Sequence, residues 1–224
     1  MEDWFPLINS LRISLCAIII VFFVGLFLAY LVKKCPRIVK GILDVILTLP
    51  LVLPPTVCGY FLILIFGPLH PIGKFLQSIG IQFFFDWKGA ILASALVSFP
   101  LMYRTARASF EAFDEDLASA GKTLGLSNWY VFWNIRIPAC KNGLIAGTIL
   151  AFARALGEYG ATQMFCGYII GKTATISTTV AYYWNNNNDE MALRWVLVNI
   201  AISAVVLIIV NIFESREKKK RVAR

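Results

Sequence analysis

Long runs of residues without a charge are the feature that most constrains this chain. Ile13–Val32 and Val45–Phe66 contain no charged side chain over lengths that cross, or nearly cross, about 30 Å of hydrocarbon. Trp195–Phe213 repeats the pattern, and Gly89–Tyr103 is a shorter version that flanking lysine and arginine side chains can extend. Apolar residues make up 58% of the sequence and charged residues 15%, which leaves too thin a polar shell for a soluble domain. The sequence therefore predicts an all-α membrane protein.

A fifth apolar segment differs from the others because it contains charges. Asn142–Phe165 is long enough to span a membrane, yet it carries Arg154 and Glu158. With this segment included, we predict five transmembrane helices in a domain of residues 1–214, followed by a basic cytoplasmic tail, 215–224. The predicted spans are 10–32, 43–66, 87–108, 139–165 and 194–213, with a long loop, 109–138, between the third and the fourth.

The lysines and arginines indicate how these helices are oriented. The loop after the first span holds four basic residues and no acid, so the positive-inside rule places it in the cytoplasm and the N-terminus outside. Two more basic clusters then also fall inside, together with the C-terminus. A net charge of +8 distributed in this way is typical of membrane anchors, and we predict membrane lipid and no nucleic acid as a partner. The three clusters are Lys33, Lys34, Arg37 and Lys40; Arg104, Arg107, Lys122, Arg136 and Lys141; and Arg216–Arg224.

Residues able to perform catalysis are sparse. The five cysteines are scattered without CxxC spacing, and the only histidine, His70, falls in a predicted turn. No Gly-rich phosphate loop occurs in the sequence. We therefore predict that the chain is not an enzyme and has no catalytic residue, no metal site and no cofactor of its own. The first span is expected to stay as an anchor, since the acidic Glu2 and Asp3 precede it where a cleaved leader has basic residues.

The loop 109–138 is predicted to contain two short helices. Helix formers continue to Leu124, where Gly125 is the stop expected at a helix C-terminus. Ser127 then suits the N-cap of a second helix, Asn128–Ile135, which Pro138 follows. The loop is therefore expected to be ordered and cytoplasmic, at the inner end of the bundle.

The first of these loop helices has an apolar stripe at helical spacing. One interpretation is a pair of helices lying in the lipid headgroup zone. The acidic cluster Glu111–Asp116 disfavours this, because an anionic leaflet would repel it. The small pair Ala120-Gly121 permits the close approach of another backbone, which favours a docking surface for a protein partner. The stripe consists of Leu117, Ala120, Gly121 and Leu124.

The same loop resembles a known signature. Ser119-Ala120-Gly121, then three residues, Gly125, nine residues and Ile135-Arg136-Ile137-Pro138 are similar to the Glu-Ala-Ala, Gly and Ile-x-Leu-Pro pattern of binding-protein-dependent ABC importer permeases. The resemblance implies that the loop docks a separate cytoplasmic ATPase, which binds the ATP and Mg²⁺. Ser119 departs from the family's glutamate, and Glu115 or Asp116, one turn earlier, is the candidate replacement. The implied docking residues are Glu115, Asp116, Ser119, Ala120, Gly121, Leu124, Gly125, Ile135, Ile137 and Pro138.

Two further motifs narrow the family. Ala153–Ala161, with the sequence ARALGEYGA, resembles the fourth-span signature of the molybdate, tungstate and sulfate group, and Leu49–Tyr60 resembles its second-span motif. The compact length fits a molybdate permease better than the longer sulfate permeases. The resemblance covers about residues 44–165 and implies a type I ABC importer permease in the cell membrane of a prokaryote. It also implies a homodimer, two copies of the ATPase and an extracytoplasmic molybdate-binding protein.

The fourth span carries a candidate ion pair. Arg154 and Glu158 stand at i and i+4, within pairing distance on one face of a helix, with Gly157 between them. A charge near mid-membrane costs at least about 2.5–3.5 kcal/mol on insertion scales, so it needs a partner or a watery cavity. Three interpretations remain: a pair that locks the bundle, Arg154 as a contact for an oxyanion on the transmembrane pathway, or a pair that breaks during gating.

Prolines and small residues shape the second and fourth spans. Pro50, Pro54 and Pro55 remove backbone donors and should kink or unwind the second span, either as a static bend or as a hinge at the gate. Small residues recur every four positions in the fourth span, which favours close helix packing at the centre of the domain or at a homodimer contact. These are Gly143, Gly147, Ala151 and Ala155.

Other functions remain open from the sequence. Tungstate and sulfate are alternative substrates. An ATP-independent transporter or channel is a rival, although such folds usually contain internal repeats and none is detectable here. A membrane scaffold that recruits a cytoplasmic enzyme would share the docking loop but would not need the charged pair. A neighbouring reading frame with a GxxxxGK[ST] motif would favour the ATP-driven importer.

Overall fold

The computed structural model describes the backbone of residues 4–222 and the side chains as far as residue 208, and every regular element in this part of the chain is a helix. A helix satisfies its backbone hydrogen bonds within its own segment, as an apolar environment requires. The elements are α1 (Phe5–Lys33), α2 (Arg37–Val52), α3 (Pro55–Phe66), α4 (Pro71–Ser78), α5 (Trp87–Glu111), α6 (Glu115–Thr123), α7 (Asn128–Val131), the π-helical turn η1 (Phe132–Arg136), α8 (Ile137–Leu156), α9 (Gly160–Cys166), α10 (Ile176–Asn185) and α11 (Asp189–Val222).

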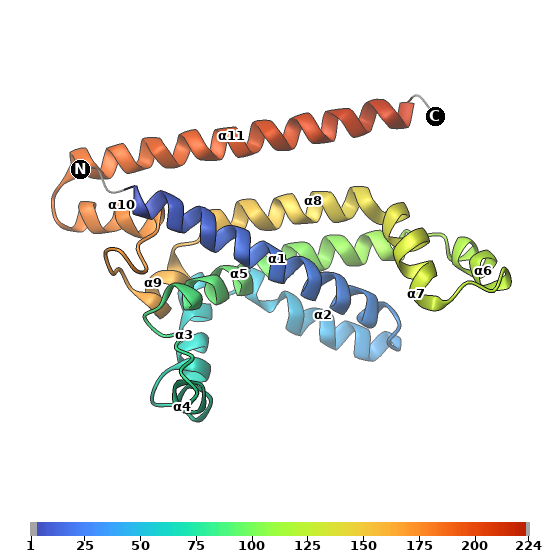
Figure 1. The fold of residues 1–224 in the computed structure, drawn as a ribbon, viewed down its shortest axis with the longest axis horizontal. Coiled ribbons are helices and arrows are strands. Elements are labelled where there is room, and N and C mark those ends of the chain that lie inside the picture. The colour runs from blue at the N-terminus through green and yellow to red at the C-terminus, as the bar shows by residue number, and fades with distance from the viewer. Residues whose placement is uncertain (1–3, 223–224) are drawn as a thin grey trace.

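The centre of the fold is a bundle of α1, α5 and α8, which run along the long axis of the molecule (Figure 1). Small residues bring these helices together. A Cβ atom added at Gly147 would lie 2.9 Å from Thr105 Cβ, and one added at Gly25 would lie 3.0 Å from Met102 Cγ. Ala151 on the same face of α8 is fully buried. Of the two places predicted for the small face of the fourth span, the structure therefore supports the centre of the domain.

Among the described residues, three helices are long and apolar enough to cross a membrane on their own: α1, α5 and the part of α11 from Asp189 to Ile208. The bent pair α2 and α3 would add a fourth span. The predicted total of five also requires α8, a helix of 20 residues that contains two charged side chains, Lys141 and Arg154. The five-span count, and the orientation with the N-terminus outside, stay predictions.

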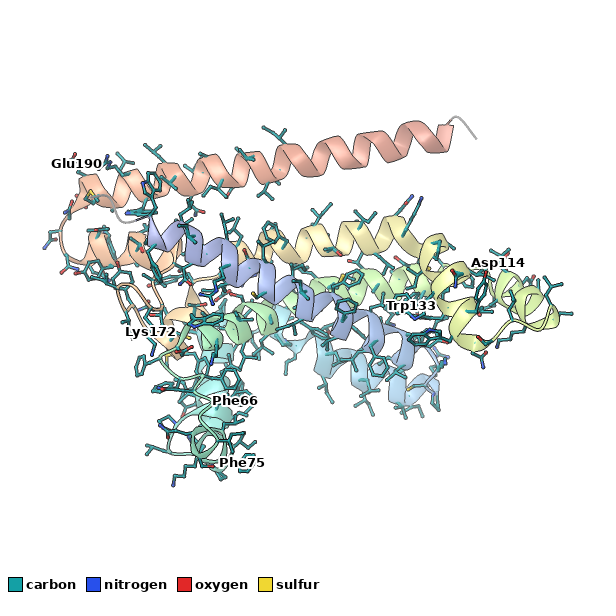
Figure 2. All side chains as sticks on the ribbon, in the orientation of Figure 1. Phe66, Phe75, Asp114, Trp133, Lys172 and Glu190 are labelled. Carbon is teal, nitrogen blue, oxygen red and sulfur yellow. The ribbon has the colours of Figure 1, made fainter. Side chains whose placement is uncertain are left out.

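The second predicted span, 43–66, is two helices and not one. α2 ends at Val52, α3 begins at Pro55, and their axes are bent by 113°. Pro54 has extended backbone angles and Pro55 is the first residue of α3, so neither can continue the hydrogen bonding of α2. The predicted break is thus confirmed. α3 and α4 form an arm that projects from the bundle and carries Phe66 and Phe75 (Figures 1 and 2).

The fourth predicted span, 139–165, is also divided, and here the prediction of one helix is wrong. α8 ends at Leu156, and α9 begins only at Gly160. At the other end of α8 the predicted short helix Asn128–Ile135 does not end before Pro138, because α7 continues through η1 directly into α8. The wide π-helical turn makes room for the proline ring, which would otherwise meet the carbonyl four residues earlier.

The two ends of the bundle carry different elements. The loop helices α6 and α7 lie at one end, and α10 lies at the other, beside the start of α11 (Figure 1). Asp114 and Trp133 mark the first end, and Lys172 and Glu190 mark the second (Figure 2). The backbone of α11 continues to Val222 through most of the predicted basic tail, whose last two residues lie outside the described residues.

Candidate functional site

The ends of the loop helix α6 follow from local side-chain chemistry. The Asp114 side chain accepts a hydrogen bond from the Asp116 backbone N–H at 3.0 Å and caps the N-terminus. Gly125 has φ +80°, the left-handed conformation that ends helices and that favours glycine. Ser127 then caps α7 by accepting from the Tyr130 N–H at 3.2 Å. The predicted stop and the predicted second cap are both confirmed.

The predicted apolar stripe of α6 is divided between two faces. Gly121 is buried, and a Cβ atom added there would lie 2.9 Å from Ile135 Cδ1, so its small size serves packing inside the loop and not the approach of a partner. Leu117 and Leu124 are instead 51% and 79% exposed, and Trp129 on α7 is 72% exposed. We call these three apolar side chains the loop surface. Apolar residues at i, i+3, i+4 and i+7 identify a stripe on a helix, but they do not show which residues of the stripe are buried by the rest of the chain.

Glu115 connects α6 to two helices of the bundle. Its carboxylate accepts from Arg136 Nη1 at 2.8 Å and from Nη2 at 2.7 Å, and it also pairs with Lys33 at the end of α1. These cations lower the pKa of Glu115 to about 2, and the pKa of Arg136 is raised by the same carboxylate. Arg136 is itself buried, with its guanidinium 4.5 Å from the Phe113 ring centroid. Glu115 therefore makes strong contacts within the chain.

The remaining predicted docking residues lie at the same end of the molecule. Asp116 and Ala120 are exposed, and the exposed Ser119 donates a hydrogen bond to the Glu115 carbonyl at 3.0 Å. Ile137 and Pro138 begin α8. Some residues of the loop motif are thus exposed, and others form the junction between the loop and the bundle.

A second charged cluster, which sequence reasoning missed, joins α2 to α5. Asp44 accepts a hydrogen bond from the Tyr103 hydroxyl at 2.6 Å and pairs with Arg107. Glu111 pairs with Arg107 and with Lys40. α2 has no fully buried residue of its own, so these polar contacts are a main part of its attachment to α5. The sequence did contain a signal for this cluster: Asp44 lies among apolar residues, and acidic residues in such stretches are rare and usually paired.

Arg154 and Glu158 do form an ion pair, but across a helix break and not along one helix. Arg154 Nη1 lies 2.9 Å from Glu158 Oε2, which meets the distance of an ion pair but not the angle of a hydrogen bond. The other carboxylate oxygen of Glu158 accepts from the Ala161 N–H of α9 at 2.7 Å. The Glu158 side chain is 1% exposed, whereas that of Arg154 is 29% exposed. The carboxylate is fixed by the fold, and the guanidinium keeps access to its surroundings.

The two breaks in the predicted spans lie against each other. α3 packs on α9, where a Cβ atom added at Gly160 would lie 3.0 Å from Pro55 Cβ. One added at Gly59 would lie 2.8 Å from the Ala161 carbonyl oxygen. The residues Pro54 and Pro55 at the first break and Gly157 and Glu158 at the second therefore belong to one region, while Pro50 lies within α2.

The fold defines a class of protein. Its broken helices, packed inside a helical bundle with a capped loop helix at one end, have the same fold as chains of solved ABC importers. A bacterial ABC transporter that imports the acidic polysaccharide alginate has a TM-score of 0.77 at 14% identity, over 96% of this chain and 80% of that one. The MetNI methionine ABC transporter has a TM-score of 0.69 at 12% identity, over 100% of both chains.

Sequence comparison then gives the family. Residues 7–219 match the family of binding-protein-dependent transport system inner membrane components, and the chain belongs to it. The molybdenum transport system permease protein ModB of Escherichia coli (strain K12) is 41% identical over 92% of this chain and 91% of that protein. ModB of Haemophilus influenzae is 40% identical over 88% and 86%, and a sulfate transport system permease protein, CysW of Synechococcus elongatus, is 31% identical over 86% and 67%. The resemblance drawn from the loop and span motifs is confirmed.

Proposed function

We propose that this chain is the membrane-spanning subunit of an ATP-driven importer of molybdate, and that it forms the transport pathway as a homodimer. The observation that carries the proposal is the 41% identity to a molybdenum transport permease along nearly the whole of both chains. Two molybdenum permeases, at 41% and 40% identity, resemble this chain more than the sulfate permease CysW does at 31%, which favours molybdate over sulfate. ATP is hydrolysed by a separate subunit, and substrate is delivered by an extracytoplasmic binding protein.

The loop surface is the proposed contact for the ATPase. Leu117, Leu124 and Trp129 present exposed apolar area on a loop whose helix ends are capped. Exposed apolar side chains on a rigid frame are what a protein interface needs, because burying them against a partner releases water at little entropic cost. Asp116, which is exposed, replaces the acidic residue that is absent at Ser119. The internal contacts of Glu115 make it a positioning residue for the loop.

Arg154 is the proposed contact for the oxyanion on the pathway. Its side chain is 29% exposed and lies beside two helix breaks. The backbone can change conformation there without breaking the hydrogen bonds of a continuous helix. A guanidinium offers paired N–H donors that match two oxygens of a tetrahedral oxyanion. Glu158 holds the guanidinium in place and lowers its net attraction for the anion, so that binding stays weak enough for release.

Uptake in reconstituted vesicles tests the proposal. The permease, its ATPase and its binding protein are assembled in liposomes loaded with ATP, and labelled molybdate is supplied on the binding-protein side. We expect uptake that requires all three proteins and ATP, and that excess unlabelled tungstate reduces more than sulfate does. Uptake by the permease alone, or sulfate competing better than molybdate itself, would overturn the assignment.

A further inference from the structure

A cavity of about 370 Å³ lies at the end of the bundle opposite the loop. Its walls come from the start of α1, the segment before α10, α10 itself and the first turns of α11. Most of the lining is apolar or aromatic and includes Trp4, Trp195 and Val198. The volume falls within the range of small-molecule sites, about 300–1,000 Å³.

Polar side chains in the lining, above all Thr179 and Arg194, distinguish the cavity from a packing defect. Thr179 is 1% exposed, lines the cavity, and its hydroxyl has no hydrogen-bond partner among the described residues. A buried hydroxyl without a partner costs free energy, so a ligand oxygen is the expected complement. Arg194 lines the same cavity from α11, is exposed, and donates from Nη1 to Met191 Sδ at 3.8 Å. The cavity therefore combines a mostly apolar lining with the unpartnered Thr179 hydroxyl, the phenol groups of Tyr168 and Tyr183, and one guanidinium.

Two tryptophans indicate that the cavity lies at the level where a membrane meets water. Trp4 immediately precedes α1, and Trp195 lies in the second turn of α11, with ring centroids 6.2 Å apart. Tryptophans at the ends of membrane helices lie at the level of the lipid headgroups. The wall between α1 and α10 is fixed, because Asn9 Nδ2 donates to the Ala174 carbonyl at 2.9 Å and the Ile176 N–H donates to Ser10 Oγ at 2.9 Å.

We propose that this cavity is a binding site for one phospholipid molecule. The Arg194 guanidinium binds the phosphate, the Thr179 hydroxyl donates to an ester carbonyl, and the upper part of an acyl chain lies against Trp195 and Val198. The lipid would cover apolar side chains on the first turns of α11, of whose most apolar window only 6% is buried within the chain. This role is independent of the proposed transport function.

Native mass spectrometry of the full-length protein, purified in a mild detergent and depleted of loosely bound lipid, measures the bound molecule. We expect about one phospholipid per chain to be retained. Val198→Phe fills the cavity and should abolish retention, whereas Ile200→Phe, on an exposed part of α11 outside the cavity, should leave it unchanged. Thermal unfolding of both variants verifies that they are folded.

Titration with phosphatidylglycerol, and with monoolein as a glycerol ester without phosphate, tests the polar contacts. Arg194→Gln should weaken phosphatidylglycerol binding about tenfold and leave monoolein unaffected, because a charge-assisted hydrogen bond contributes about that factor. Lys172→Gln, a cation outside the cavity that pairs with Asp86, is the control and should bind like the wild type. Thr179→Val, which keeps the side-chain volume, should weaken both lipids.

Three results would overturn the proposal. One is wild-type protein that retains no phospholipid. The second is equal loss in Val198→Phe and Ile200→Phe, which would indicate general lipid contact along α11. The third is loss of the dimer in Val198→Phe with lipid retention unchanged, which would make the cavity an interface between two copies of the chain.

Discussion

The two side chains of the ion pair Arg154–Glu158 differ in burial and in their other contacts. Glu158 is 1% exposed and is also bonded to the start of α9, while Arg154 is 29% exposed. Sequence spacing predicted the pair but not which of its two side chains is buried. The difference arises from the break after Leu156, which turns Glu158 inward while Arg154 remains on the last turn of α8.

This asymmetry predicts unequal costs of mutation. Arg154→Met leaves a buried carboxylate without its cation and should lower the free energy of unfolding by about 3–5 kcal/mol. Glu158→Met should lower the free energy of unfolding by less, because water can reach the Arg154 guanidinium that loses its partner. The double variant should recover part of the stability that Arg154→Met loses. Thermal unfolding in detergent measures all three, and equal losses in the two single variants would contradict the interpretation.

Uptake by the same variants tests the role of Arg154. If the double variant regains stability but not molybdate uptake, Arg154 acts on the pathway. Full recovery of both quantities in the double variant would leave the pair with a structural role alone.

Glu115 predicts a pH dependence of the loop. Its pKa is lowered from 4.5 to about 2 in the folded protein by Arg136 and Lys33. The stabilisation is therefore fully present above about pH 4.5 and is lost as the pH falls towards 2. Hydrogen exchange of α6 should be slow at pH 7 and should rise between pH 4 and 2, after correction for the intrinsic pH dependence. Glu115→Gln should exchange fast across the whole range, and a loop as protected as the wild type in that variant would contradict the prediction.

The helices show how far sequence patterns predict this fold. The ends of α6 and the cap of α7 were predicted because Gly125 and Ser127 act through their own local backbone. The break between α8 and α9 was not, because Gly157 and Gly160 lie within an apolar run that reads as one continuous span. The contacts of Asp44 with Tyr103 and Arg107 join residues about 60 positions apart, and no local pattern encodes that proximity.

Packing between the broken helices predicts different effects for two glycines. Gly59→Ala places a Cβ atom 2.8 Å from the Ala161 carbonyl oxygen, so α3 must move away from α9, at a cost of about 1–3 kcal/mol. Gly41→Ala in α2 has nothing within 4 Å and should stabilise the helix by about 0.5–1 kcal/mol. The free energies of unfolding should therefore change in opposite directions. A harmless Gly59→Ala would mean that α3 is not held against α9.

At the scale of the whole molecule, the loop and the arm lie in different places (Figure 1). A mutation in one of them should therefore leave the function of the other unchanged. Leu124→Asp adds a charge to the loop surface, where the side chain is 79% exposed, so the fold should stay intact while co-purification with the ATPase is lost. Leu69→Asp, on the arm beside α3 and 82% exposed, is the matched control and should keep the ATPase bound. Retention of the ATPase by Leu124→Asp at the wild-type ratio would remove the loop surface from the docking site.

The continuity of η1 and α8 has a mechanical consequence. α8 alone has 20 residues, which is a rod about 30 Å long. Arg136 at one end of this rod is clamped to α6 through Glu115, and the other end stops at Gly157, beside the two helix breaks. A displacement of α6 would therefore be passed to α8 as one continuous helix, and the first place where the helical backbone is interrupted is Gly157. Because α8 packs on α5 and α1, such a displacement would reach the charged pair together with the bundle around it.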